Sequence, residues 1–209
     1  IPMKQLMTLF ILLSVCSSGF AATSVSELQK DWAVTSYELQ DDEQAQAFEQ
    51  LIETAANAVA MQPSNAELLI WKAIIESTYA GKASSLTALR LVKAARADLE
   101  AAMEIDPMAL DGSAYTSLGA LYYQVPSWPI AFGSSKKARK LLEKAIEVNP
   151  DGIDSNYFYG AFLVEEKDYD SARQALMKAM QAPARPGREL ADSGRRAEIT
   201  ELLNQLDES

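Results

Sequence analysis

Aromatic side chains gathered around one proline-rich segment are the best candidates for chemistry in this chain. Residues 125–133 read VPSWPIAFG and lie between two helix-like segments. Tyrosines precede and follow the segment, and a tyrosine combines an apolar ring with a hydroxyl that forms hydrogen bonds. Such side chains suit the binding of an extended or amphiphilic molecule. The candidate contacts to a ligand or partner are Tyr122, Tyr123, Val125, Trp128, Phe132, Asn156, Tyr157 and Tyr159.

Two interpretations of residues 125–133 are open. The two prolines restrict the backbone, so the segment is stiff in both. In the first, Trp128, Ile130 and Phe132 fold back and fill a gap between helices, because large apolar side chains are unfavourable in water. In the second, the segment forms one wall of a cleft that the tyrosines also line. Asn156 is expected to hold the segment through its side-chain amide.

The residue types argue against catalysis. The chain has no histidine and one cysteine, Cys16, which removes the usual base near neutral pH, the histidine-containing triads and most zinc sites. Acidic runs at residues 41–43 and 165–170 lack the glycine and spacing of a calcium loop, and Asp168 is expected to cap a helix instead. Trp32 and Trp71 are expected to pack in the core. We therefore predict a non-enzymatic protein with no metal site and no cofactor.

The charge of the chain also limits its partners. The net charge is −10, which leaves no basic surface to replace counterions along a phosphate backbone, so nucleic acid is not an expected partner. Basic residues near the C-terminus alternate with acidic ones and are expected to form a solvated helix face. These basic residues are Arg185, Arg188, Arg195 and Arg196.

Residues 1–22 are predicted to be a signal peptide. Lys4 supplies a positive charge, residues 6–16 are mostly apolar, and small residues follow. The apolar run is shorter than the roughly 20 residues that a membrane-spanning helix needs. Cleavage is expected after Ala21 or Ala22. Residues 23–209 then form one secreted domain, and the most plausible compartment is a bacterial periplasm.

A second interpretation of the leader gives a lipid-anchored protein. Residues 13–16 read LSVC and resemble a bacterial lipoprotein box, in which Cys16 would carry the lipid and become the N-terminus. Val15 departs from the small residue usual at its position. Both interpretations place the body of the protein outside the cytoplasm.

An internal repeat runs through the rest of the chain. Three similar segments end at Pro63, Pro107 and Pro150, which are 44 and 43 residues apart. Alanine or leucine recurs 5, 8 and 12 residues before the second and third prolines, positions that share one face of a helix. Small residues let a neighbouring helix approach closely, and proline ends the helix. These positions are Ala95, Leu99 and Ala102 in one copy and Ala138, Leu142 and Ala145 in the next.

The pattern resembles the tetratricopeptide repeat (TPR). In the last copy Gly160, Ala172 and Ala179 fit a unit of about 34 residues, with helices expected over residues 154–166 and 168–181. The resemblance implies an all-α, TPR-like α-solenoid of antiparallel helix pairs, about nine helices in all. A final helix near residues 189–206 is expected to cap the stack.

Two further local predictions concern loops and helix starts. The earlier copies are longer, and we expect the excess between the paired helices, at residues 79–86 in one copy and 125–135 in the next. The pairs Ser24 with Glu27 and Ser64 with Glu67 are predicted capping boxes.

A narrower resemblance covers residues 110–180. The matching features are the helix with Gly119, the Val-Pro-x-Trp-Pro-x-x-Phe-Gly segment, KKA and NPDGIDSNYFYG. These features resemble the T-component proteins of tripartite ATP-independent periplasmic (TRAP) transporters. They are also similar to the regulator of microtubule dynamics family. The first resemblance implies a periplasmic substrate-binding protein as partner, a small apolar solute, and a ring of identical copies. The alternative function is a protein–protein interaction scaffold of the cell envelope without a small-molecule site.

Overall fold

The computed structural model describes residues 23–208, and within that range the chain forms nine α-helices and no β-strand. The predicted signal peptide, with Cys16, lies outside the described residues. The helices are α1 (Val25–Tyr37), α2 (Asp41–Met61), α3 (Ala66–Ala80), α4 (Ser85–Ile105), α5 (Ala109–Gln124), α6 (Ser135–Val148), α7 (Ile153–Glu165), α8 (Tyr169–Met180) and α9 (Glu189–Asp207). None of these helices is both long enough and apolar enough to cross a membrane.

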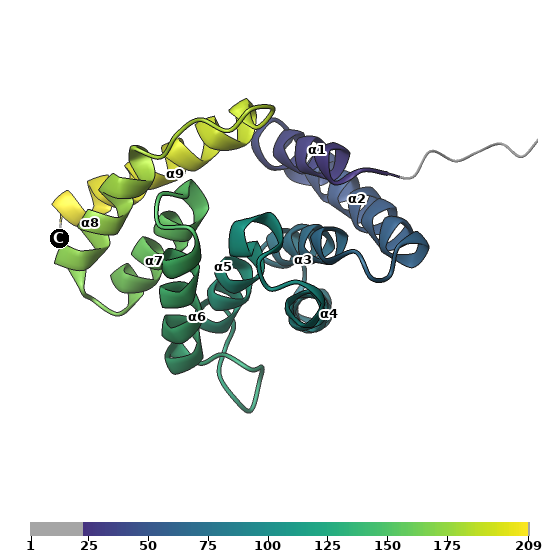
Figure 1. Cartoon of the computed structure of the whole chain (residues 1–209), viewed down its shortest axis with the longest axis horizontal. Helices are drawn as coiled ribbons and strands as arrows, with labels where there is room; N and C mark the ends of the chain where they lie inside the picture. The colour runs from purple at the N-terminus through teal and green to yellow at the C-terminus, as the bar shows by residue number, and fades with distance from the viewer. Residues whose placement is uncertain (1–22, 209) are drawn as a thin grey trace, which may run out of the picture.

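Consecutive helices form antiparallel pairs that stack side by side in a curved row (Figure 1). The odd-numbered helices α1, α3, α5, α7 and α9 contact one another in order and form the inner layer. The even-numbered helices cover the outside. This arrangement confirms the predicted all-α, TPR-like α-solenoid of antiparallel pairs with a C-terminal capping helix.

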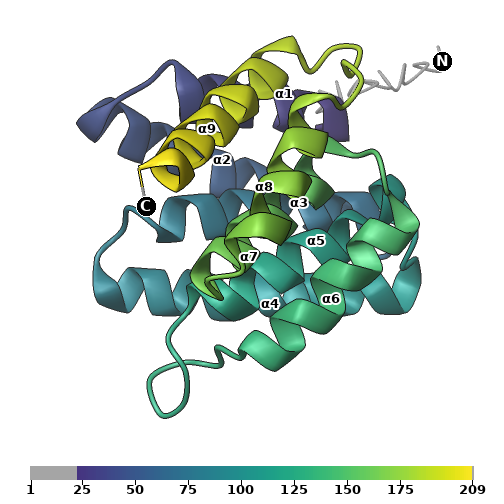
Figure 2. The same cartoon turned by 90° about the vertical axis from the view of Figure 1, so that its left-hand side faces the viewer.

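The capping helix also returns to the start of the chain. Beyond its contacts with α7 and α8, α9 packs against α1, so the inner layer closes on itself (Figures 1 and 2). Gly194 makes this approach close, because a Cβ there would overlap the ring of Tyr37. The solenoid is therefore a closed turn and not an open row.

The repeated small residues form the contacts within the pairs. Gly119 of α5 and Gly160 of α7 lie directly against the outer helix of their own pair. A Cβ on Gly119 would lie 2.7 Å from Cγ of Leu142, and one on Gly160 would lie 2.8 Å from Cγ of Leu176. The outer helices contribute fully buried side chains at Ala95, Leu99, Ala102, Ala138, Leu142, Ala145, Ala172, Leu176 and Ala179. Pro63, Pro107 and Pro150 lie exposed, two residues beyond the ends of α2, α4 and α6.

The helix starts follow local side-chain chemistry, with one correction. Ser24 and Glu27 form the predicted capping box at α1. Asp168 caps α8 by accepting a hydrogen bond from the backbone N–H of Ser171 at 3.3 Å. The predicted Ser64 cap is wrong, because Asn65 takes that role and accepts from two backbone N–H groups at 3.1 and 3.3 Å. Asparagine caps a helix as well as serine does, and Asn65 directly precedes α3.

The extra length of the earlier copies is only partly in loops. Residues 125–134 do form a loop between α5 and α6. The expected long loop at residues 79–86 is wrong, because only residues 81–84 lie outside helices there. The excess lengthens α4 to 21 residues, against 14 in α6. Residues 86–94 read LTALRLVKA, which favours continued helix.

We predict that Gly160→Ala lowers the free energy of unfolding by about 1–3 kcal/mol, because the added methyl group forces α7 away from Leu176. Helix propensity alone predicts the opposite, a gain of about 1 kcal/mol. Urea denaturation followed by circular dichroism measures the change. In a Leu176→Ala background the same glycine substitution should lose most of its effect, and equal effects in both backgrounds would contradict this packing.

Candidate functional site

The inner layer encloses a cavity of about 580 Å³. Its walls come from α1, α3, α5, α7 and α9, together with residues of three turns and one side chain of α2. The closing contact between α1 and α9 therefore forms part of the cavity wall. The aromatic side chains in the lining are Trp32, Tyr37, Phe48, Trp71, Tyr157 and Phe158.

The aromatic rings form two groups in the lining. Around Trp32, the centroids of the Tyr37 and Trp71 rings lie 5.7 and 5.8 Å away in edge-on arrangements. The second group is Tyr157 with Phe158, 5.0 Å apart between centroids. Nε1 of Trp32 donates to the hydroxyl of Thr78 at 3.0 Å, so this indole presents its ring and not a free donor. The cavity lining thus combines aromatic rings with polar side chains, among them Ser77, Thr116 and Gln124.

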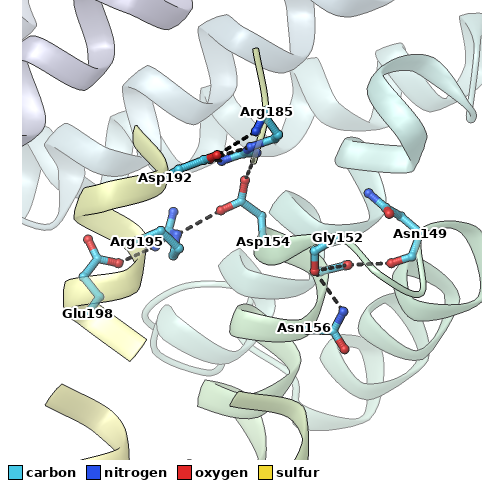
Figure 3. A network of polar contacts seen from close by, with 9 residues as sticks. Asn149, Gly152, Asp154, Asn156, Arg185, Asp192, Arg195 and Glu198 are labelled. Carbon is cyan, nitrogen blue, oxygen red and sulfur yellow. Dashed lines mark hydrogen bonds and ion pairs between the residues drawn. The ribbon is translucent and has the colours of Figure 1, made fainter. Parts of the chain in front are cut away.

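A cluster of ion pairs joins α7 to α9 at the edge of the cavity (Figure 3). Asp154 lies between two arginines: its Oδ2 is 2.7 Å from Nη1 of Arg185, and its Oδ1 is 2.9 Å from Nε of Arg195. Arg185 also pairs with Asp192 at 2.6 Å, and Arg195 pairs with Glu198. Asp154 therefore ties the start of α7 to the segment before α9 and to α9 itself.

The same cluster reaches α1. Glu198 accepts a hydrogen bond from the hydroxyl of Tyr37 at 3.1 Å, across 161 residues of sequence. The guanidinium of Arg195 lies over the rings of Tyr157 and Phe158, 4.3 and 4.8 Å from their centroids. Burial raises the pKa of the Tyr37 hydroxyl well above its usual value, so this group remains a hydrogen-bond donor at neutral pH.

The charges in the cluster strongly favour the ionised carboxylate of Asp154. Burial by itself would raise the pKa of Asp154, but the positive charges of Arg195 and Arg185 outweigh it and hold the pKa at about 2. Burial would likewise lower the pKa of Arg195, and the charge of Asp154 raises it instead. Each partner thus stabilises the charged form of the other.

Arg188 differs from the other arginines of this region. Its guanidinium lies 5.0 Å from the centroid of the Trp71 ring, at the cavity wall. Its Nε is buried without a hydrogen-bond partner, and no ion pair of Arg188 occurs among residues 23–208. Burial and then the charge of Arg185 lower the pKa of Arg188 below its usual value.

The predicted solvated face near the C-terminus is therefore wrong. Arg195 is buried and Arg185 and Arg188 are half-buried, because three carboxylates and two aromatic groups face them. A signal was present in the sequence: Arg188, Asp192 and Arg195 are spaced i, i+4 and i+7, which places them on one helix face. Trp32 and Trp71 are buried, as expected for core residues, but they also line the cavity.

The segment 125–133 does not form a wall of this cavity, and of the eight candidate residues only Tyr157 lines it. Phe132 packs edge-on against the buried ring of Tyr122, 5.5 Å between centroids, as in the gap-filling interpretation. Trp128 and Ile130 depart from both interpretations, because they are 85% and 67% exposed. The segment forms a loop that projects from the stack beside the start of α6 (Figure 2).

Backbone hydrogen bonds hold the loop at its base. The N–H of Gly133 donates to the carbonyl of Pro126 at 2.9 Å, and the N–H of Ser134 donates to the carbonyl of Tyr122 at 2.7 Å. The stiff loop therefore holds Trp128 away from the helices that surround it.

The remaining candidate residues have packing or turn contacts. Asn156 is buried and donates to the carbonyls of Pro150 and Gly152, both at 2.8 Å. It thus fixes the turn between α6 and α7 and not residues 125–133, as Figure 3 shows. Tyr123 packs against Phe162, 5.7 Å between centroids, and Val125 and Tyr159 are half-buried. Whether any of these residues contacts a ligand or partner stays a prediction.

The described part of the chain holds no group of three or more histidine, cysteine, aspartate or glutamate side chains that could bind a metal ion. The paired acids of the cluster face arginines instead.

Comparisons with known proteins identify the family. Residues 26–207 match the model of the family described as Regulator of microtubule dynamics protein 1-3. Eight chains of solved structures match as well. One is a crystal structure of MamA protein, with 18% identity over 88% of this chain and 91% of that chain and a TM-score of 0.44. At that TM-score the match says nothing about function. No curated protein matches the chain at a significant level.

We predict that Asp154→Asn lowers the free energy of unfolding by about 2–3 kcal/mol at pH 7. The folded-state pKa of about 2 lies below the unfolded value, so the stabilisation is present above about pH 4 and is lost as the pH falls towards 2. The difference between the two proteins should therefore shrink over that range. Denaturation at several pH values measures it.

Asp151→Asn is the matched control. Asp151 pairs with Lys178 at 3.2 Å, but its side chain is 78% exposed, so the change should stay below about 1 kcal/mol. Parallel pH profiles for the wild type and Asp154→Asn between pH 4 and 2 would contradict the assignment.

Proposed function

This chain belongs to the regulator of microtubule dynamics protein 1-3 family, and from that premise we propose that it is a non-enzymatic helical-repeat protein with two binding surfaces. It binds a small apolar solute in the cavity and a protein partner at the exposed loop. The cavity carries the first part of this proposal. Its volume of about 580 Å³ falls within the roughly 300–1,000 Å³ typical of small-molecule sites, and aromatic rings line it.

The loop of residues 125–134 supports the partner site. Trp128 and Ile130 project into solvent from a stiff loop, and tryptophan is enriched among the residues that contribute most to protein–protein binding. Lys136 and Lys140 lie exposed on the adjoining first turns of α6, and neither forms an ion pair within residues 23–208. The partner that fits is a protein with an apolar pocket and an acidic rim.

The proposal extends to compartment and pathway. Residues 1–22 support secretion to a periplasm, or anchoring through a lipid on Cys16. The resemblance of residues 110–180 to TRAP transporter T-components supports a periplasmic substrate-binding protein as the partner, and copies of the chain assembling into a ring. The alternative is a scaffold of the cell envelope that binds no solute. In that case the exposed loop alone would form the binding surface for protein partners.

Native mass spectrometry of the full chain, purified from the periplasm of a bacterial host, tests the solute. We expect a population of molecules that carries the extra mass of one small molecule. Ser117→Phe places a ring into the cavity from α5 and should abolish this population. Ser64→Phe, at an exposed position outside this cavity, should keep it. Absence of any bound species in the wild type would leave only the scaffold.

Site-specific photo-cross-linking in cells tests the partner. A p-benzoylphenylalanine at position 128 should form one discrete adduct with another protein, because Trp128 lies at the proposed docking surface. The same group in place of exposed Lys30 on α1 should form none. Equal labelling from both positions would contradict docking at the loop.

A further inference from the structure

We propose that the cavity recognises an apolar molecule with a single carboxylate, which accepts hydrogen bonds from Arg188, Trp71 and Ser36. This inference rests on the proposed solute-binding function and adds the chemical class of the solute.

Three donors without partners carry the inference. Among residues 23–208, Oγ of Ser36, Nε1 of Trp71 and Nε of Arg188 are buried and lack a hydrogen-bond partner. All three residues line the cavity. The only other such atom there, Oε2 of Glu76, is an acceptor, and Glu76 is not part of the lining. An unpaired buried donor costs about 1–3 kcal/mol, so three of them in one cavity favour a ligand that brings acceptor oxygens.

Ring contacts and helix geometry place these residues near one another in the lining. Arg188 lies over the Trp71 ring at 5.0 Å, and the ring of Trp32 lies 5.8 Å from that of Trp71. Ser36 follows Trp32 by one helical turn on α1, so both residues share a face. Trp71 itself is only 4% exposed, which leaves the cavity as the route by which its N–H can meet a ligand.

The neighbouring acids form their hydrogen bonds with other groups and none with Arg188. Both oxygens of Asp154 face Arg185 and Arg195. Both oxygens of Asp192 are bound to Arg185, one by the side chain and one by the backbone N–H at 2.8 Å. Glu198 accepts from Tyr37 and Arg195. Arg188 is thus left with a charge that no carboxylate of the cluster contacts.

The single unpaired arginine of this region matches a ligand with one negative charge. Among the three arginines beside the cavity, Arg185 and Arg195 pair with the acids of the cluster, and Arg188 pairs with none of them. The lowered pKa of Arg188 reflects burial and the repulsion from Arg185, and one anion beside it would relieve both. A second negative charge beside Arg188 would meet the carboxylates of the cluster, because the other unpaired cation of the lining, Lys82, lies on the turn between α3 and α4 and donates to Gln44.

The aromatic part of the lining favours a ligand body with apolar surface. The rings of Trp32, Tyr37 and Phe158 line the cavity, and the polar groups of the first two are already hydrogen-bonded within the protein. They therefore offer ring surface and not additional polar contacts. The geometry fits a flat or hydrocarbon body with its carboxylate directed towards Arg188.

Isothermal titration calorimetry with three naphthalene probes tests this class. The probes are 2-naphthoate with one carboxylate, 2-naphthylmethanol with none, and 2,6-naphthalenedicarboxylate with two. The full chain should bind 2-naphthoate at least tenfold more tightly than either of the other two.

Two variants and one control assign the contact. Arg188→Gln should weaken 2-naphthoate binding at least tenfold and leave 2-naphthylmethanol binding unchanged. Trp71→Phe keeps a ring but removes the N–H, so it should weaken 2-naphthoate binding several-fold. This variant tests the contact independently, even where Arg188→Gln fails to fold. Arg90→Gln, at an exposed position of α4, should behave as the wild type.

The other possible results would each contradict either the ligand class, the assigned contacts or the solute site. Equal or tighter binding of the alcohol or the dicarboxylate would refute the single-carboxylate assignment and leave the solute-binding function standing. Unchanged 2-naphthoate binding in the Arg188 and Trp71 variants would refute the assigned contacts. Binding of none of the three probes would count against both the inference and the proposed solute cavity.

Discussion

The ion pairs of Asp154 with Arg185 and Arg195 are the interaction on which the closed shape depends. They fix α9 against α7, and Glu198 and Gly194 on the same helix then meet Tyr37 of α1. A buried arginine without its carboxylate would be strongly unfavourable, so α9 has one satisfactory position. Without this closure the inner layer would be an open groove, and Arg188 would lie in water instead of at a cavity wall.

Two kinds of contact therefore determine the fold: apolar packing within the helix pairs and the charged cluster at α9. Glycine against leucine and alanine within each pair sets how closely the helices approach, and the stacked pairs set the curvature. This packing is apolar and is repeated along the chain. The charged cluster occurs where the last helix returns to the first, and it determines that the turn closes. The cavity arises because the apolar packing of the stacked pairs forms its curved wall and the charged cluster completes that wall at α9.

The sequence predicts well what depends on neighbouring residues. The alanine and leucine spacing, the prolines after the outer helices and the Ser24 cap act within one or two helical turns, and the structure confirms the elements that they predict. The cluster was missed because Asp154 lies 31 and 41 residues before its arginines. Both interpretations of Trp128, gap filling and a cleft wall, started from its apolar ring, and the backbone bonds that hold its loop outward leave no pattern in sequence.

A crystal structure of the protein with its bound solute tests the central claim most directly, that closure by α9 leaves the donors of Arg188 and Trp71 for a ligand. The account predicts α9 in contact with α1, and a ligand oxygen within about 3.2 Å of Nε of Arg188 or Nε1 of Trp71. A structure in which α9 lies apart from α1, or in which both nitrogens bond to protein groups inside a filled cavity, would contradict it.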